Sequence, residues 1–449
     1  MDKLEEFIRE HKITEVECLV PDMAGIARGK IIPADKLLRI LRERGMPLPE
    51  SVFAQTVTGN YPDELDEHIS PTYGDVYLTP DEATVRFVPW YQEPTAQIIC
   101  DAFYSDDTPV PLSSRQLLKM IVKEYDKRGW TPVVAPELEF YLVAVNTDPD
   151  IPLQPPVGRT GRQEIGRQAY GIDAVNEFDP VFEDVYDYCE KQNIDIDTLS
   201  HEAGAAQIEV NFNHGDPVEL ADQAFLFKRT SREVAIRHGV YATFMAQPMQ
   251  TEPGSAMHIH QSVVSKKTGK NIFATDAGND SALLRHYVGG LQRYLPYAIP
   301  LFAPNVNSYR RFGHKETDSP INVEWGVDNR TAGLRIPVSK PENRRIENRL
   351  PGADGNPYLT IASTLACGLL GMIEEIEPSE QIKGSAYKKG HTLPGSLTDA
   401  LKKFKACKPL SNLLGERFVK TYVAIKEAEY KAYNTVISSW ERENLLLNV

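Results

Sequence analysis

Apolar and polar positions alternate with two different periods along the chain, and each period predicts a different element. Residues 4–11 have the spacing of a short helix, whereas 15–22 (EVECLVPD) and 26–33 (IARGKIIP), on either side of a glycine turn, alternate as strands. Apolar segments near 52–58 and 96–100 continue this strand-like pattern. The first hundred residues therefore predict a small unit that is mostly β.

A Pro- and Asp-rich stretch at 106–111 (DDTPVP) predicts a linker after this unit. The segment 113–129 then starts with two serines, spaces its apolar residues by three and four, and ends in glycine, which predicts a helix. Strands and helices alternate irregularly after it, and the chain is helical by pattern from about Leu397 onward. We therefore predict an α+β protein with a small domain at 1–108 and a large α/β domain at 109–449.

Composition narrows the class of protein. The 449 residues carry a formal net charge of -14, which argues against nucleic acid as a partner because phosphate binding requires a basic surface. The most apolar long stretch, 358–373, is shorter than a membrane span and contains Thr and Ser, so it predicts a buried helix. The first residues have no signal-peptide core, and the five cysteines form no CxxC pair. These features predict a cytoplasmic protein without a membrane partner.

The stretch PELEF, residues 136–140, places two carboxylates one residue apart in an otherwise apolar segment. On a strand, side chains alternate with a period of two, so Glu137 and Glu139 share a face at close range. Like charges at that distance repel each other. Either this face is a solvated strand edge, or a cation lies between the two carboxylates, and the pentapeptide alone leaves both interpretations open.

Three later stretches add acidic and imidazole groups: SHEAGAAQIEV contains Glu202 and Glu209, PGSAMHIHQS contains His258 and His260, and RRIENRL contains Glu347. Each has an ordinary explanation, namely a turn cap, a core or surface histidine, and an ion pair. Taken together with PELEF, five carboxylates and one imidazole suit a hard divalent cation such as Mg²⁺ or Mn²⁺.

The second half of the chain also carries an unusual series of arginines, namely Arg310, Arg311, Arg330, Arg335, Arg344, Arg345 and Arg349. Guanidinium groups bind phosphate and carboxylate through two parallel hydrogen bonds. Metal ions and arginines together are the equipment of phosphoryl transfer. The chain has no GxxxxGK[ST] loop, so an ATP-using enzyme of this sequence is not of the P-loop class.

The ordered motifs PELEF, HEAGAAQIE, PGSAMHIHQS, NRTAGLRIP and RRIENRLPGADGNPYL resemble those of bacterial type I glutamine synthetases, as do DMAGIARGKIIP and LPGSLTDAL. The resemblance covers nearly the whole chain. It implies a β-grasp-like N-terminal domain, a catalytic α/β domain, and a dodecamer of two stacked hexameric rings. In that family the small domain of one subunit closes the active site of the next.

The resemblance also implies a role for each matched residue. One metal ion would be held by Glu139, Glu202 and Glu209, and a second by Glu137, His258 and Glu347, with two or three Mg²⁺ or Mn²⁺ ions in each site. The nucleotide-binding residues would be His260, Ser262, Arg335 and Arg345. The glutamate-binding residues would be Gly254, Arg311 and Arg349. The catalytic residues would be Asp75, Glu316, Asp318 and Arg330.

The implied reaction uses ATP to convert the γ-carboxylate of glutamate into an acyl phosphate, which an amine then attacks. Positive groups neutralise the charge of the transferring phosphoryl group. Amines are protonated at neutral pH, so the amine pocket needs a carboxylate as cation binder and general base.

Two segments depart from the family pattern. Where glutamine synthetases have an FDGSS-like loop whose aspartate helps to bind ammonium, this chain has VFAQTVTG, with Phe53 near the aspartate position. Asp75 still matches a second acidic position of that pocket. In the flap RRFGHKETDSP, Asp318 is the base when counted from the following proline, and Glu316 when counted from Arg311. Both remain candidates.

These departures predict a pocket for a larger amine than ammonia, because an aromatic and apolar surface can contact methylene groups and attract a distal ammonium. We predict a glutamate–amine ligase that resembles the γ-glutamylpolyamine synthetases, with putrescine or another polyamine as substrate in polyamine catabolism. The alternatives are a glutamine synthetase that uses ammonia and, in a different class, a non-catalytic structural or regulatory oligomer.

Overall fold

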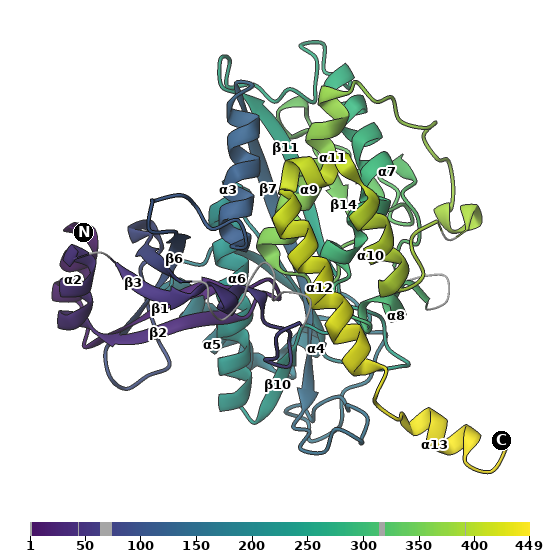
Figure 1. Cartoon of the computed structure of the whole chain (residues 1–449). Coiled ribbons are helices and arrows are strands. Elements are labelled where there is room, and N and C mark those ends of the chain that lie inside the picture. Colours follow the sequence, from purple (N-terminus) through teal and green to yellow (C-terminus); the bar gives the residue numbers. More distant parts are fainter. Residues whose placement is uncertain (1, 44, 63–73, 314–318, 391) are drawn as a thin grey trace.

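Two β-sheets organise the chain in the computed structural model (Figure 1), which describes residues 2–43, 45–62, 74–313, 319–390 and 392–449. The six-stranded sheet has the order β2-β1-β6-β4-β3, with β5 paired to β6. The eight-stranded sheet has the order β12-β13-β14-β11-β7-β9-β8, with β10 paired to β7. In Figure 1 the small sheet and its helices form a separate lobe beside the large sheet.

The small sheet is built almost entirely before residue 104. Its strands are β1 (Glu15–Pro21), β2 (Ala27–Pro33), β3 (Met46–Pro49), β4 (Asp75–Pro80), β5 (Arg86–Phe87) and β6 (Thr95–Phe103). The accompanying helices are α1 (Asp2–Glu10), α2 (Ala34–Glu43) and the 3-10 helices η1 (Glu50–Ala54) and η3 (Glu82–Thr84). The predicted helix at 4–11 and the predicted strands at 15–22, 26–33 and 96–100 are confirmed.

The strand-like prediction near 52–58 is wrong. This segment begins in η1 and continues as a turn. The buried residues of η1 are Glu50, Phe53 and Ala54, so that Phe53 and Ala54 follow Glu50 by three and four, which is a helical period rather than the period of two that a strand requires.

The large sheet and its covering helices make up the rest of the chain. Its strands are β7 (Trp130–Ala144), β8 (Ile196–His201), β9 (Gln207–Phe212), β10 (Val240–Thr243), β11 (Met257–Ser265), β12 (Trp325–Val327), β13 (Leu334–Ile336) and β14 (Ile346–Asn348). The helices are α3 (Ser114–Asp126), α4 (Ile172–Asn176), α5 (Asp179–Lys191), α6 (Pro217–Arg237), α7 (Ala282–Phe302), α8 (Ser308–Gly313), η4 (Pro341–Asn343), α9 (Pro357–Ile373), η5 (Ala386–Lys389), α10 (Leu397–Ala406), α11 (Lys408–Leu414), α12 (Glu416–Tyr433) and α13 (Ser439–Leu445).

The most apolar helix, α9, is central to the core. All but two of its residues are buried, and the hydroxyl of Tyr125 on α3 donates to the carbonyl of Leu365 at 2.7 Å. This burial explains its apolar sequence, and the predicted buried helix at 358–373 is confirmed. None of the helices in the described part of the chain combines the length and the apolar character that crossing a membrane requires.

Strand β7 separates the core from the opposite face of the large sheet. Leu138 and Phe140 are 0% and 1% exposed, and the Phe140 ring packs against Phe227 of α6 with ring centroids 6.0 Å apart. Because side chains alternate along a strand, Glu137 and Glu139 point to the other face. The core under α6 thereby orients both carboxylates of PELEF away from itself.

A buried ion cluster joins the two lobes. Arg115, the second residue of α3, donates to Asp222 of α6 at 2.8 and 2.9 Å, to Asp101 of β6 at 2.7 Å and to Asp81 at 2.8 Å. The Arg115 side chain is 2% exposed. The predicted boundary at 108/109 lies just before this cluster, between β6 and α3, and remains a prediction.

Candidate active site

The register of adjacent strands brings the predicted site residues together on one face of the large sheet. In the β7–β9 pair Glu139 lies opposite Glu209, and in the β7–β11 pair Glu137 lies opposite His258. Residues that are directly opposite in an antiparallel pair share a face, and so do residues two apart on one strand. All four side chains therefore project from the same side.

The same face continues across two further strands. His260 of β11 lies opposite Glu347 of β14, and Glu347 lies opposite Arg335 of β13. Neighbouring strands are about 5 Å apart, so this row of five strands places carboxylates at one end and an arginine at the other.

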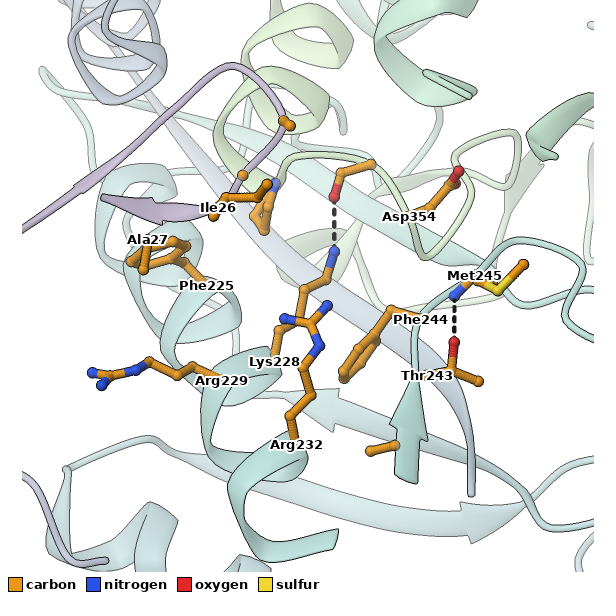
Figure 2. A pocket seen from close by; sticks show the side chains of 15 residues that line it. Ile26, Ala27, Phe225, Lys228, Arg229, Arg232, Thr243, Phe244, Met245 and Asp354 are labelled. Carbon is orange, nitrogen blue, oxygen red and sulfur yellow. Dashed lines mark hydrogen bonds between the residues drawn. The ribbon is translucent and has the colours of Figure 1, made fainter. Parts of the chain in front are cut away.

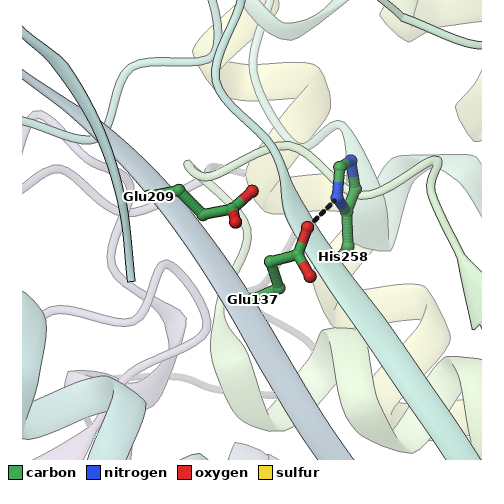
Figure 3. Close-up of side chains that lie close together, drawn as sticks. All are labelled: Glu137, Glu209 and His258. Atoms are coloured by element: carbon green, nitrogen blue, oxygen red, sulfur yellow. Dashed lines mark hydrogen bonds and ion pairs between the residues drawn. The ribbon is translucent and has the colours of Figure 1, made fainter. Parts of the chain in front are cut away.

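Three of these side chains form a group with the spacing of metal ligands. Glu137, Glu209 and His258 offer ligand atoms that all lie within 4.8 Å of one another, and Figure 3 shows them converging on one space. His258 Nδ1 lies 3.1 Å from Glu137 Oε1. This group differs from the assignment of metal ligands that the resemblance implies, in which Glu209 shares one metal ion with Glu139 and Glu202.

The electrostatics of this face favour a bound cation. Burial, together with the neighbouring carboxylates, raises the pKa of Glu139 to about 8 and that of Glu209 to about 10. Burial and Glu137 also raise the pKa of Glu202. The carboxylates therefore repel one another more than the nearby positive groups compensate, and a divalent cation with oxygen and imidazole ligands fits this donor set.

Glu347 differs from the other acidic residues because arginines already pair with it. It is fully buried, Arg335 donates to it at 2.8 Å and Arg349 at 2.5 Å. Although burial raises its pKa, the charges of Arg349 and the two histidines outweigh this effect and lower it to about 2. His258 Nδ1 lies 3.7 Å from Glu347 Oε1, so the carboxylate also borders the candidate metal group.

A cavity of about 510 Å³ adjoins the candidate metal group. All four predicted nucleotide-binding residues line it, namely His260, Ser262, Arg335 and Arg345. Glu137 lines it as well, so the cavity and the candidate metal group share a wall. This volume is in the range of small-molecule sites. Asn211 and His214 are among the lining residues that the sequence interpretation missed. Asn211 follows Glu209 by two on β9, and this spacing could have indicated it.

Two of the three predicted glutamate-binding residues, Gly254 and Arg311, lie on the Glu139 side of the face, whereas the Arg349 side chain pairs with Glu347. Arg311 of α8 is 3% exposed and donates to the carbonyl of Leu350 at 2.8 Å. A Cβ on Gly254 would lie only 2.7 Å from Arg311 Cγ, so the close approach requires glycine. Gln207, which the sequence interpretation missed, connects the Gly254 loop with the candidate metal ligand Glu139. Its Nε2 donates to the Gly254 carbonyl at 3.0 Å and to Glu139 at 3.3 Å.

The predicted catalytic residues are not all brought to this face. Arg330 is exposed in the loop between β12 and β13, and its charge lowers the pKa of Glu202. Asp75 is exposed on β4, which belongs to the other sheet. Glu316 and Asp318 lie outside the described residues. A single chain therefore assembles the predicted metal, nucleotide and glutamate residues but leaves Asp75 apart.

The predicted aromatic surface at Phe53 is wrong. Phe53 is 0% exposed and belongs to the core of the small lobe, so its ring offers no surface to an alkyl chain. The turn at 55–61, which follows Phe53, exposes two apolar side chains, Val57 and Tyr61, at 49% and 48%. The backbone N–H of Val57 donates to Glu429 of α12 at 2.8 Å, which anchors the turn to the large lobe.

A sheet face with candidate ligands for divalent cations, beside an arginine-lined cavity, is typical of metal-dependent enzymes of phosphoryl transfer. The family model for the glutamine synthetase catalytic domain matches residues 111–445. The chain belongs to the glutamine synthetase family.

Curated relatives and solved structures agree with this assignment. The chain is 36% identical to γ-glutamylputrescine synthetase PuuA of Escherichia coli K12, covering 96% of this chain and 92% of the relative. It is 31% identical to glutamate–isopropylamine ligase of a Pseudomonas species, covering 98% and 96%. A solved structure of GmaS with ADP has a TM-score of 0.85 at 26% identity, covering 99% of this chain and 100% of that chain.

These comparisons confirm the predicted family, the α+β fold of the glutamine synthetase type, and the enzyme class of glutamate–amine ligases. The use of ATP and a divalent metal goes with the family. The roles of individual residues, the identity of the metal and the choice of amine remain predictions.

Proposed function

We propose that this enzyme joins the γ-carboxylate of glutamate to an amino group of putrescine or a related polyamine, with conversion of ATP to ADP, in polyamine catabolism. The observation that carries the proposal is the similarity to a γ-glutamylputrescine synthetase over 96% of the chain. The turn at 55–61 supports it, because this turn contains no carboxylate and exposes Val57 and Tyr61, where the small domain of glutamine synthetases has an ammonium-binding aspartate.

Two or three Mg²⁺ or Mn²⁺ ions would supply charge neutralisation for phosphoryl transfer when bound by the six predicted ligands, Glu137, Glu139, Glu202, Glu209, His258 and Glu347. Arg335 and Arg345, together with His260 and Ser262, would orient the phosphates of ATP in the arginine-lined cavity. Arg330 would approach the transferring phosphoryl group from its exposed loop.

Glutamate would bind between Gly254, Arg311 and Arg349, with its γ-carboxylate toward the nucleotide cavity. Once γ-glutamyl phosphate has formed, the amine must lose a proton before it attacks, and Glu316 or Asp318 is the proposed base. Asp75 would bind the ammonium form of the amine. A diamine carries a second ammonium, and the exposed ring of Tyr61 could attract it as a cation–π partner.

An amine panel tests the proposal. ADP release is measured with ATP, Mg²⁺ and glutamate against ammonium, isopropylamine, putrescine, cadaverine and spermidine. We expect kcat/KM for putrescine or another polyamine to exceed that for ammonium by about 100-fold, because each well-packed methylene contributes about 1–3 kcal/mol. Turnover with ammonium alone would make the protein a glutamine synthetase. No turnover with any amine, in an intact oligomer, would favour the non-catalytic alternative.

We also propose a cytoplasmic dodecamer of two hexameric rings, in which neighbouring subunits share each active site. Two observations support this proposal: Asp75 lies exposed on the small sheet, and the segment 436–449 exposes seven large apolar side chains. These are Val436, Ile437, Trp440, Leu445, Leu446, Leu447 and Val449. In Figure 1, α13 extends away from the body of the chain, where it can reach another subunit.

Complementation between two inactive variants tests the shared site. We expect Asp75→Asn and Glu209→Gln each to lose activity, and a mixture refolded together to regain it, because some interfaces then combine an intact small domain with an intact metal site. The measurement is putrescine-dependent ADP release before and after co-refolding. A mixture as inactive as its components would show that each chain completes its own site.

A further inference from the structure

A second cavity, of about 410 Å³, lies between the two lobes. It is lined by the turn at 24–27, by α6, by β10 with the residues that follow it, and by the loop before α9, and it is open to solvent on one side. None of the predicted active-site residues that the structure describes lines it. Figure 2 shows that charged side chains of α6 reach into it from one side.

Three cationic side chains from α6 line this cavity: Lys228, Arg229 and Arg232. Arg229 pairs with Glu17 and donates to Gln97 at 2.7 Å, and Figure 2 shows it pointing away from the other two. Lys228 and Arg232 are one helical turn apart. Like charges at this spacing destabilise a helix by a few tenths of a kcal/mol, so the arrangement gains from a bound counter-charge.

Neither of these two cations has a carboxylate in direct contact within the described part of the chain. Lys228 Nζ donates to the backbone carbonyls of Ala353 and Gly355 at 2.6 and 2.8 Å. The Arg232 guanidinium lies 5.1 Å from the centre of the Phe244 ring and makes no hydrogen bond with described residues. Burial and the charge of Arg232 lower the pKa of Lys228 to about 7, and the opposing effect of the Asp354 carboxylate is smaller.

Among the described residues, the cavity wall carries one carboxylate, Asp354, and other residues already engage one of its two oxygens. Its Oδ2 accepts from Ser308 at 2.6 Å and from Asn305 at 2.8 Å. The remaining wall is partly apolar, with Phe225 and Phe244 beside the cations. The cavity thus combines an excess of positive charge with a surface that can contact a short carbon chain.

We propose that this cavity binds a small anion through a carboxylate or phosphate group, with Arg232 and Lys228 as its charge partners. The ligand would seat against the 24–27 turn of the small lobe on one side and the 353–355 loop of the large lobe on the other. It would therefore bridge the two lobes.

Hydrogen bonds of Lys228 and Asp354 connect the cavity to the helix that carries Arg311, one of the proposed glutamate-binding residues. Lys228 holds the 353–355 loop through two carbonyls, and Asp354 of that loop accepts from Ser308, the first residue of α8. Arg311 lies on the same short helix. An anion that draws Lys228 toward itself changes the loop that positions α8. This coupling rests on the proposed role of Arg311, whereas anion binding does not.

Calorimetric titration of the full-length protein, without nucleotide or glutamate, tests the binding. Inorganic phosphate and succinate are titrated separately, which distinguishes a phosphate ligand from a carboxylate ligand. We expect one of them to bind the wild type and Arg232→Gln to weaken that binding at least tenfold. The matched control is Arg293→Gln, since Arg293 is also exposed on a helix and lies over an aromatic ring, at 5.9 Å from Tyr294. Binding by neither probe, or equal binding by wild type and Arg232→Gln, would overturn the site.

Steady-state kinetics test the coupling. We expect the anion that binds to change the KM of the wild type for glutamate about fivefold or more. The same anion should leave the KM of Arg232→Gln unchanged. Without the anion, the two proteins should have the same kcat. If the anion binds the wild type but leaves its KM for glutamate unchanged, the proposed coupling between the cavity and the glutamate site is refuted. Because binding is measured without substrates, its outcome is separate from that of the amine panel.

Discussion

Replacing Glu209 by glutamine is expected to abolish ligase activity and, in the same protein, to raise the melting temperature of the metal-free chain. Glu209 faces Glu139 across the β7–β9 pair and shares the candidate metal group with Glu137. Without a cation these carboxylates repel one another, and glutamine removes one charge while keeping the shape. With the metal lost, activity should fall about a thousandfold or more, since a bound cation supplies several kcal/mol and each 1.4 kcal/mol is tenfold.

The raised pKa of Glu209 predicts how the stability difference between the wild type and Glu209→Gln changes with pH. The pKa of Glu209 is raised to about 10 in the folded chain, above its value in an unfolded chain. As pH rises above about 4.5, the unfolded chain loses this proton first, so the metal-free wild type loses stability progressively up to about pH 10. The melting temperature of Glu209→Gln should therefore exceed that of the wild type by more at pH 8 than at pH 5.

The measurements are Mn²⁺ titration, putrescine-dependent ADP release and thermal melting in the presence of a chelator. Glu190→Gln is the matched control, because Glu190 is an exposed glutamate on α5 and should leave all three unchanged. Retained turnover in Glu209→Gln would refute the metal assignment. A lower melting temperature without metal would refute the repulsion argument.

Replacing Arg115 by methionine is expected to cost about 3–5 kcal/mol of stability at the junction of the two lobes, the range for removing one partner of a buried ion cluster. Asp222 is buried and, among the described residues, would keep one hydrogen-bond donor, the hydroxyl of Tyr358 at 2.6 Å. Lys119→Met is the matched control. Lys119 contacts Asp101 at 2.6 Å but is 32% exposed, so its loss should cost about 1 kcal/mol or less.

Urea unfolding followed by circular dichroism measures the cost, and limited proteolysis at the 106–111 linker reports whether the lobes separate. We expect the linker of Arg115→Met to be cleaved faster than that of Lys119→Met. Adding Asp222→Asn should restore part of the stability, because it removes the buried charge that arginine no longer neutralises. Equal costs for the arginine and lysine variants would contradict a buried cluster that clamps the lobes.

Local periodicity explains why much of the candidate site could be predicted. The one-residue gaps in PELEF and in His-Ile-His place Glu137 with Glu139, and His258 with His260, on common strand faces. The side-chain period of a strand does not depend on its neighbours, so these pairings could be derived from the sequence. His214 could not, because it follows β9 in a loop and stands in no pattern that distinguishes it from other polar loop residues. Gln207 precedes Glu209 by two on β9, so the strand period could have indicated it.

Phe53 shows why one residue difference from the family pattern is not enough to predict the surface of a pocket. An aromatic residue at the place of an aspartate suggested a surface for an alkyl chain, yet the 3-10 geometry of η1 turns this ring into the core. Side-chain direction there depends on which face of a short helix packs inward. That choice is made by the neighbouring sheet, and a single sequence does not report it.

The sequence by itself determined the family, the order of the elements and the kinds of ligand atoms available, because these depend on residue type and on spacing along one strand or helix. The tertiary structure decided which carboxylates meet: strand register places Glu209 with Glu137 and His258 and surrounds Glu347 with arginines. It also created the cavity at Lys228 and Arg232, whose walls come from segments as distant in sequence as 24–27 and 354–357. Contacts between distant segments follow from how the whole core packs, and local periodicity carries no information about them.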